Sequence, residues 1–131
     1  MKNKLAFILL LLCTGSMAGI SQETKIYPEK TVYYKTGINN ELVYVNEENY
    51  QKELTFFIHS ETHISLNFYI GEYRYTYFFD YHYSDDNGAD DEIQYWKSEA
   101  NEALLILDPN KISLYSFKDN WAIVYHIKDK Y

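Results

Sequence analysis

Cysteine, proline and arginine are scarce in this chain of 131 residues. The single cysteine, Cys13, excludes an intramolecular disulfide, so the stability of the fold has to come from a hydrophobic core. The two prolines, Pro28 and Pro109, are too few for a proline-rich linker, and the sequence contains neither an internal repeat nor a low-complexity segment. The length therefore predicts one domain with one core.

Positive charge is low as well. The chain has 12 basic and 19 acidic residues, which give a formal net charge of −7, and Arg74 is its one arginine. Nucleic acids and anionic membrane surfaces bind clustered lysine and arginine, so both are poor partners for this chain. Solubility accounts for an acidic charge of this size.

Residues 1–21 are expected to be a cleaved secretory signal peptide. Two lysines precede an uncharged apolar run from Leu5 to Cys13, and the small residues that follow fit cleavage after Ala18 or after Ser21. The run is about half of the ~20 residues that span a bilayer as a helix. We therefore expect export to the periplasm or the medium. Loss of the two lysines leaves 10 basic residues against 19 acidic ones, a formal charge of about −9.

Cys13 allows a different processing route. The sequence Leu10-Leu11-Leu12-Cys13 resembles a bacterial lipoprotein site, in which the cysteine is lipidated and becomes the first residue. The residue before that cysteine is normally small, and here it is Leu12. A lipid anchor at Cys13 is therefore the alternative to a leader that is simply removed.

The mature chain, 22–131, is expected to form a single tyrosine-rich β domain. It contains all 15 tyrosines, and aromatic side chains bury large areas in a core. Short segments rich in β-branched and aromatic residues alternate with turn residues. Strands are predicted at 31–36, 42–46, 53–59, 63–70, 72–83, 93–98, 103–107, 112–117 and 121–127. This pattern predicts an all-β fold, a small antiparallel meander, barrel or sandwich of about eight or nine strands, after a polar leader at 22–30.

The clearest pattern is a change of phase at Gly71. Apolar residues occupy even positions from Ile64 to Ile70, and aromatic residues occupy odd positions from Tyr73 to Tyr83. A two-residue turn that begins at Gly71 explains both the glycine and the change of phase. In this register Ile70 faces Tyr73, and the tyrosine row points to the same side as the apolar face. A glycine bulge within one long strand is the alternative.

Two expectations concern the second half of the chain. A three-residue loop at 118–120 would place Phe117 opposite Trp121 and Tyr115 opposite Ile123, with Asn120 in the left-handed region. The apolar residues of 92–104 also approximate a helical face, which would make the fold α+β.

Histidines and carboxylates form the first candidate site. His59, Glu61 and His63 alternate, and the hairpin register sets His63 opposite Asp80 and Glu61 opposite His82. Imidazole and carboxylate groups on one sheet face bind zinc or another divalent metal. A metal site is therefore predicted at His59, His63, Asp80 and His82. The alternatives are a turn at Ser60-Glu61-Thr62 and a solvated face with cross-strand ion pairs.

An acidic loop forms the second candidate site, with carboxylates at Asp85, Asp86, Asp90, Asp91 and Glu92. Calcium prefers such oxygen ligands, but the spacing differs from that of an EF-hand. The simplest interpretation is a charged hairpin loop. A calcium site and a negative patch that docks on a basic protein partner are the functional alternatives.

The tyrosine row forms the third candidate site. Tyr81 and Tyr83 extend beyond the apolar stretch that the row faces, so they are expected near an open end. The row predicts either a packed core whose hydroxyls reach the rim or a cavity for a small apolar or glycan ligand, held by Tyr77, Tyr81 and Tyr83.

Catalytic motifs are not recognisable in the sequence. There is no nucleophile elbow and no glycine-rich phosphate loop, and no cofactor is expected. The sequence therefore predicts an exported, non-enzymatic binding module for a small ligand. The alternatives are an interaction module, such as an inhibitor of a secreted enzyme or an immunity factor, and a metal-dependent activity.

Export from the native host is expected to release a chain that begins at Gly19 or Gln22. Intact mass spectrometry of the secreted protein distinguishes the two cleavage positions. A chain that begins at a lipidated Cys13, or one that keeps residues 1–21, would contradict this expectation.

Overall fold

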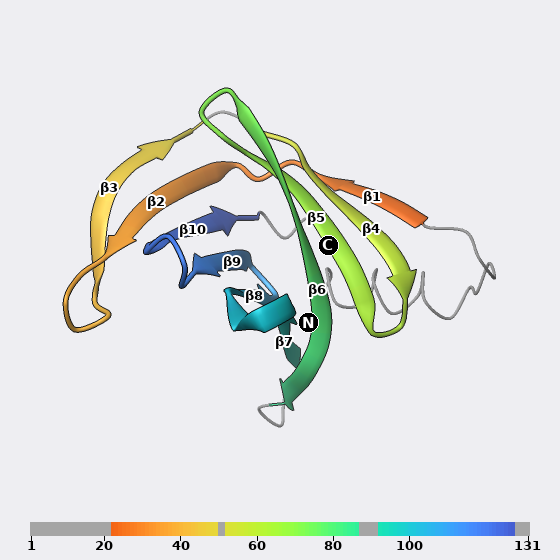
Figure 1. Ribbon diagram of the computed structural model, residues 1–131. Coiled ribbons are helices and arrows are strands. Elements are labelled where there is room, and N and C mark those ends of the chain that lie inside the picture. The colour runs from red at the N-terminus through yellow and green to blue at the C-terminus, as the bar shows by residue number, and fades with distance from the viewer. Residues whose placement is uncertain (1–21, 50–51, 87–91, 128–131) are drawn as a thin grey trace.

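The computed structural model describes residues 22–49, 52–86 and 92–127, and in them the expected all-β class is confirmed (Figure 1). The strands are β1 (Gln22–Ile26), β2 (Lys30–Thr36), β3 (Leu42–Glu48), β4 (Leu54–Ser60), β5 (His63–Ile70), β6 (Tyr73–Asp86), β7 (Glu92–Ser98), β8 (Ala103–Asp108), β9 (Lys111–Ser116) and β10 (Trp121–His126). A single 3-10 turn, η1 (Glu99–Asn101), separates β7 from β8.

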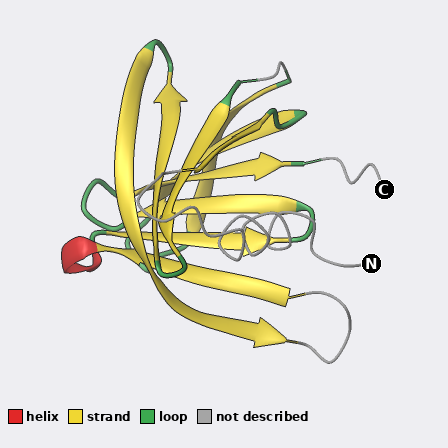
Figure 2. Ribbon diagram, turned by 90° about the vertical axis from the view of Figure 1, so that its right-hand side faces the viewer, coloured by secondary structure: helices red, strands yellow, loops and turns green. Residues whose placement is uncertain are grey.

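All ten strands belong to one antiparallel sheet in the order β1-β4-β5-β6-β7-β8-β9-β10-β2-β3. The sheet curls into a half-barrel, as Figures 1 and 2 show from two sides, with β1 and β3 as its edges. The architecture is therefore one curled sheet and not a sandwich of two. In the ranges that the structure describes, no helix has the length and apolar character needed to cross a membrane.

A very short connection explains the curl. β1 is the outermost strand at one edge, and β2 is the second strand from the other edge, yet only residues 27–29 join them. Four Cα-to-Cα steps reach at most about 14 Å. The two sides of the sheet must therefore approach each other at this point, and a flat sheet of this order is excluded.

The strands are also strongly staggered around the curl. Pairing leads from Lys25 through β4 and β5 to Thr76, and in the other direction from Thr31 through β10, β9, β8 and β7 to Ser84. Thr76 and Ser84 lie eight positions apart on β6. This stagger accounts for the 14 residues of β6, whose first half pairs with β5 and whose second half pairs with β7.

The hairpin predicted at Gly71 is confirmed. Ile70 pairs with Tyr73 and Ile64 pairs with Phe79, and the pairs between them follow the predicted register. Gly71 has a φ of 63°, a region that side chains with a Cβ rarely adopt. The alternative of one continuous strand is wrong.

The helix considered for 92–104 is wrong, because these residues form β7, η1 and the start of β8. Burial along β8 alternates with period two: Ala103, Leu105 and Leu107 are buried, and the residues between them are only partly so. Ala100 and Asn101 have positive φ, which ends any helical path. The helical spacing in the sequence came from two strands joined by a tight turn.

The register predicted for the last hairpin is wrong by one residue. The loop has four residues, 117–120, so that Ser116 pairs with Trp121 and Leu114 pairs with Ile123. The Ser116 carbonyl accepts a hydrogen bond from the backbone N–H of Asn120 at 3.0 Å, which closes the longer loop. The left-handed conformation expected at Asn120 is confirmed by its φ of 60°.

The polar leader expected at 22–30 contains a strand instead. β1 pairs with β4 along its whole length, from Gln22 opposite Ile58 to Ile26 opposite Leu54. Its side chains are exposed or partly buried in alternation, and Ile26 packs against the core. An edge strand of this kind needs little apolar sequence, since backbone pairing holds it.

The core lies on the inner face of the curl. Its fully buried side chains come from both halves of the sheet and include Phe56, Leu66, Phe68, Phe79, Leu105, Ile112, Leu114 and Tyr125. Since no second layer covers this face among the described residues, the sheet buries its apolar side against itself.

We expect Phe68→Ala to lower the free energy of unfolding by about 3–5 kcal/mol, because Phe68 is fully buried on the inner face. Phe78→Ala is the matched control, since Phe78 is 63% exposed, and its cost is expected to stay below about 1 kcal/mol. Urea unfolding measures both. Equal losses would mean that the core lies elsewhere.

Candidate functional site

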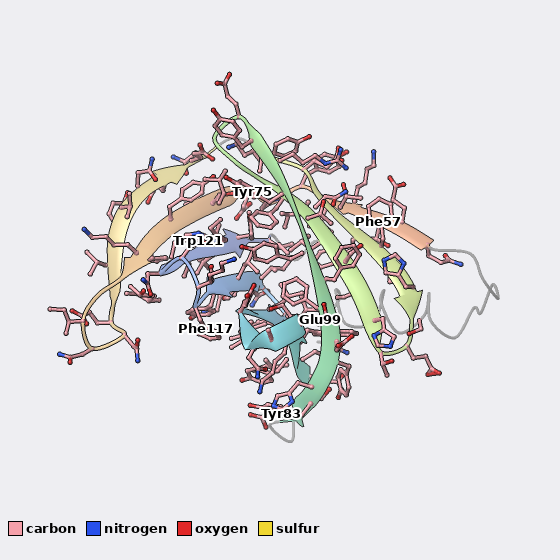
Figure 3. The ribbon with its side chains drawn as sticks, in the orientation of Figure 1. Phe57, Tyr75, Tyr83, Glu99, Phe117 and Trp121 are labelled. Atoms are coloured by element: carbon pink, nitrogen blue, oxygen red, sulfur yellow. The ribbon has the colours of Figure 1, made fainter. Side chains whose placement is uncertain are left out.

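An aromatic cluster lies on the inner face, where the first half of β6 crosses the curl (Figure 3). Its members are Phe68 from β5, Tyr75, Tyr77 and Phe79 from β6, and Trp121 from β10. Tyr75 stacks on Phe68 with ring centroids 5.6 Å apart, and Tyr77 meets the same ring edge-on at 5.3 Å. Trp121 stacks on Tyr77 at 6.4 Å.

The stagger of the sheet creates this cluster. β7 ends at Ser98, which pairs with Phe79, so Tyr75 and Tyr77 extend beyond the end of the neighbouring strand. The curl then brings them over the start of β10, four strands away in the sheet order, where Trp121 lies. The contact between Tyr77 and Trp121 therefore depends on the shape of the whole sheet.

Exposure rises along β6 from the core outwards. Phe79 is buried and Tyr77 is partly buried, whereas Tyr75 is 40% exposed and Tyr73 is 73% exposed. These four alternate residues lie on the inner face. The cluster thus runs without interruption from the core to solvent, and its outer rings present aromatic surface that a ligand can reach.

The hydroxyl of Tyr77 is tied to the sheet. It forms a hydrogen bond with the side chain of Ser116, a buried residue of β9. Burial raises the pKa of Tyr77, and the nearby carboxylates of Asp119 and Glu102 raise it further. The ring is therefore fixed and neutral, with the carboxylates of Asp119 and Glu102 nearby.

Tyr81 lies further along β6, away from this cluster. Its ring meets the buried Trp96 edge-on with centroids 5.3 Å apart, and its hydroxyl is hydrogen-bonded to Ser84. Since Tyr81 pairs with Trp96, it remains on the inner face, as the tyrosine row predicts.

Tyr83 lies on the opposite face, so the expectation that it points the same way as Tyr77 is wrong. A bulge between Tyr81 and Tyr83 makes Tyr83 pair with Tyr95, the neighbour of the inward-facing Trp96. One inserted residue, His82, reverses which side chains face inwards. Tyr83 stacks on Tyr95 with centroids 4.4 Å apart and an interplanar angle of 10°.

The predicted metal ligands are only partly brought together. His63 Nδ1 and Asp80 Oδ1 are hydrogen-bonded across β5 and β6, as the register predicts. His59 lies at a bulge of β4, where its Nε2 is 3.0 Å from Ser65 Oγ, and His82 lies at the bulge of β6 beside Tyr83. Within the described residues, no three His, Cys, Asp or Glu side chains are grouped to hold a metal.

Glu61 lies in the turn between β4 and β5, so the predicted pairing of Glu61 with His82 is wrong. The backbone N–H of Tyr81 instead donates to the carbonyl of Thr62 at 2.9 Å. The turn considered at 60–62 is therefore confirmed at Glu61 and Thr62.

The acidic loop is described only at its two ends. Asp85 is exposed near the end of β6, and the last backbone pair of the hairpin sets Asp86 opposite Glu92. Asp90 and Asp91 lie outside the described residues. Docking of this loop on a basic partner stays a prediction.

Two neighbouring hydroxyls on the inner face lack protein partners. Thr31 and Tyr125 pair across β2 and β10, and among the described residues neither Thr31 Oγ1 nor the Tyr125 hydroxyl has a hydrogen-bond partner, although both are buried. Burial raises the pKa of Tyr125 well above its usual value, and nearby Tyr33 and Glu48 raise it further. The Tyr33 hydroxyl donates to Glu48 Oε1 at 2.8 Å, and Lys52 Nζ lies 3.3 Å from the same oxygen.

Sequence reasoning missed Trp121 and the pair of buried hydroxyls. Trp121 reaches the cluster only because the sheet curls, and no spacing in the sequence encodes that contact. Tyr75 was identifiable, because it belongs to the tyrosine row that the sequence pattern shows; the stagger that exposes it is reflected in the length of β6, 14 residues.

Comparison of the chain with protein-family models, with curated proteins and with solved structures gives no match. Function is therefore inferred from the side chains themselves.

We expect Tyr125→Phe and Tyr77→Phe to differ in their effect on the free energy of unfolding. Loss of the Tyr125 hydroxyl removes a buried group without a protein partner, so the free energy of unfolding should stay level or rise by up to about 1 kcal/mol. Tyr77→Phe breaks the hydrogen bond with Ser116 and should cost about 1 kcal/mol. Thermal or urea unfolding of the two variants checks the difference; a marked loss for Tyr125→Phe would show that its hydroxyl is bonded in solution.

Proposed function

We propose that the protein is an exported, non-enzymatic binding protein that holds a small neutral molecule, or a sugar ring of a glycan, against its aromatic cluster. The observation that carries the proposal is the connected set of inner-face rings that runs from buried Phe79 to Tyr77 and, through Phe68, to Tyr75, which is 40% exposed. Ligand sites typically combine apolar and aromatic walls with a few fixed polar groups.

The chemistry of the cluster favours a flat ligand with hydroxyl groups. Tyr75 is 40% exposed and Trp121 is partly buried, so the part of each ring that other rings leave uncovered offers stacking surface, and tyrosine hydroxyls at the rim can donate and accept hydrogen bonds. A sugar ring has an apolar face and a polar edge. A small aromatic compound with hydroxyl groups also has an apolar face and a polar edge. Both fit this surface.

Charge narrows the ligand class further. Carboxylates of Asp119 and Glu102 lie close enough to raise the pKa of Tyr77, and the chain carries a formal net charge of −7. An anionic ligand would be repelled. A neutral ligand is proposed because the cluster itself consists of uncharged rings, which offer stacking and hydrogen bonds and no ion pair. Stacking and hydrogen bonding hold such a ligand without changing its bonds, which supports capture rather than catalysis.

The predicted ligand residues divide into two groups. Tyr77 belongs to the cluster with Tyr75 and Trp121, and Tyr81 packs with Trp96 further along the same face. Tyr83 stacks on the other face and cannot contact a ligand that lies on Tyr77. The proposed site is therefore Tyr75, Tyr77 and Trp121, with Tyr81 beyond it.

Native mass spectrometry of the protein purified from its own host provides the first test. A discrete mass excess is expected, and its size identifies the ligand class. That compound is then titrated against the purified protein while tryptophan fluorescence is followed, because Trp121 lies in the proposed site.

Tyr75→Ala is expected to weaken binding of that compound about tenfold, since one exposed stacking partner contributes about 1–1.5 kcal/mol. Tyr44→Ala, another exposed tyrosine on a different strand, should leave binding unchanged. Salt should have little effect, because no ion pair is formed. Equal affinity of Tyr75→Ala and the unaltered protein would refute the site, and a co-purifying protein without a small molecule would favour the interaction module.

A further inference from the structure

The two edges of the sheet differ in how they are protected against pairing with another chain. β1 has five residues, and its exposed Lys25 forms ion pairs with Glu23 at 3.5 Å and Glu53 at 3.6 Å. A short strand with an exposed lysine is a common device against edge-to-edge association. The β1 edge is therefore protected.

The β3 edge lacks this protection. Four consecutive apolar residues, Leu42, Val43, Tyr44 and Val45, are between 38% and 57% exposed. From Thr36 to Asn49 the sequence contains neither lysine, arginine nor proline. Among the described strands β3 pairs with β2 alone and ends the sheet order, so its other side presents backbone N–H and C=O groups.

Acidic residues lie at both ends of the apolar stretch of β3. Glu41 precedes Leu42 and is exposed, and Glu47 follows at the other end and is exposed as well. On the outer face of the sheet, Leu42 and Tyr44 are followed by Glu47, because a bulge at Val45 shifts the pairing with β2. The β3 edge is therefore apolar in the middle and carries acidic side chains at both ends.

We propose that β3 pairs with an extended peptide segment of a partner protein, with apolar side chains flanked by lysine or arginine. Backbone hydrogen bonds would extend the sheet by one strand, and alternate side chains would contact Leu42 and Tyr44. A basic residue opposite Glu47 and another opposite Glu41 would complete the charge pattern. This surface is separate from the aromatic cluster, so the proposal does not rest on the proposed ligand.

A second copy of this chain fits the edge less well. With Val45 bulged out, antiparallel self-pairing centred on Tyr44 would set Glu41 of each chain opposite Glu48 of the other, and Leu42 opposite Glu47. Like charges directly opposite each other destabilise a strand pair. The whole chain is acidic as well, which adds repulsion between copies and attraction for a basic partner.

The test uses a synthetic hexapeptide with blocked ends, Lys-Thr-Val-Thr-Val-Lys, titrated into isotopically labelled protein. With Val45 bulged out of the pairing, its valines lie opposite Leu42 and Tyr44 and its lysines opposite Glu41 and Glu47. Amide signals of Leu42–Glu48 are expected to shift and to gain protection from hydrogen exchange, with a Kd in about the micromolar range. A second peptide with glutamate in place of both lysines should bind about fivefold more weakly or worse, because each cross-strand ion pair is lost. High salt should reduce the difference between the two peptides.

Val45→Lys places a charge on the edge and is expected to weaken binding of the lysine peptide at least about tenfold. Ile38→Lys is the matched control, since Ile38 is almost fully exposed at the tip of the same hairpin and the charge change is equal. This control should bind the peptide as the unaltered protein does.

Three results would overturn the proposal. The first is no shift of the β3 signals at peptide concentrations up to about 1 mM. The second is equal binding of the lysine and glutamate peptides. The third is a homodimer, measured by light scattering, that Val45→Lys dissociates, because the occupant of the edge would then be a second copy of this chain.

Discussion

The structure depends on one constraint: a single sheet with an apolar face has to bury that face against itself. Helices or a second sheet usually supply the cover, and the described residues contain neither. Curling brings the side chains of β4–β6 into contact with those of β8–β10, so that Phe68, Leu114 and Tyr125 share one cluster. The three-residue connection between β1 and β2 requires the same curl, and the stagger of the strands accompanies it.

The sequence contained enough information for the local structure. Nine strands, the Gly71 hairpin and its register followed from period-two alternation and one glycine, because neighbouring strands interact through directly opposed pairs. Features that depend on a single extra residue could not be predicted from this alternation. The bulge at His82 reverses the direction of Tyr83, and the fourth residue of the 117–120 loop shifts the last hairpin. In both places the composition hardly differs between the two registers, and only tertiary packing decides between them.

The residues of the candidate site also divide into those that the sequence pattern could place and those that it could not. Tyr77 and Tyr81 could be placed on the inner face from the alternation alone, and His63 could be placed opposite Asp80. Trp121 could not be assigned, since its contact with Tyr77 joins strands that are four positions apart in the sheet. The partnerless hydroxyls of Thr31 and Tyr125 were equally hidden, because both residue types are ordinary in strands. Sequence patterns thus identify the face, and the curl decides which residues on it meet.

The position of β2 has a consequence for the order of assembly. β2 lies between β3 and β10, and its pairing joins Lys30 to His126, two residues 96 positions apart in the chain. The hairpins β2–β3 and β8–β9 can form from local sequence, whereas the seam between β2 and β10 requires almost the whole chain. Closing a loop of that size costs chain entropy before the new contacts contribute stability. Folding is therefore expected to take about milliseconds to seconds. A chain that stays open until β10 is available leaves the apolar strands β4 and β5 uncovered for longer, and such transiently exposed strands are where aggregation starts.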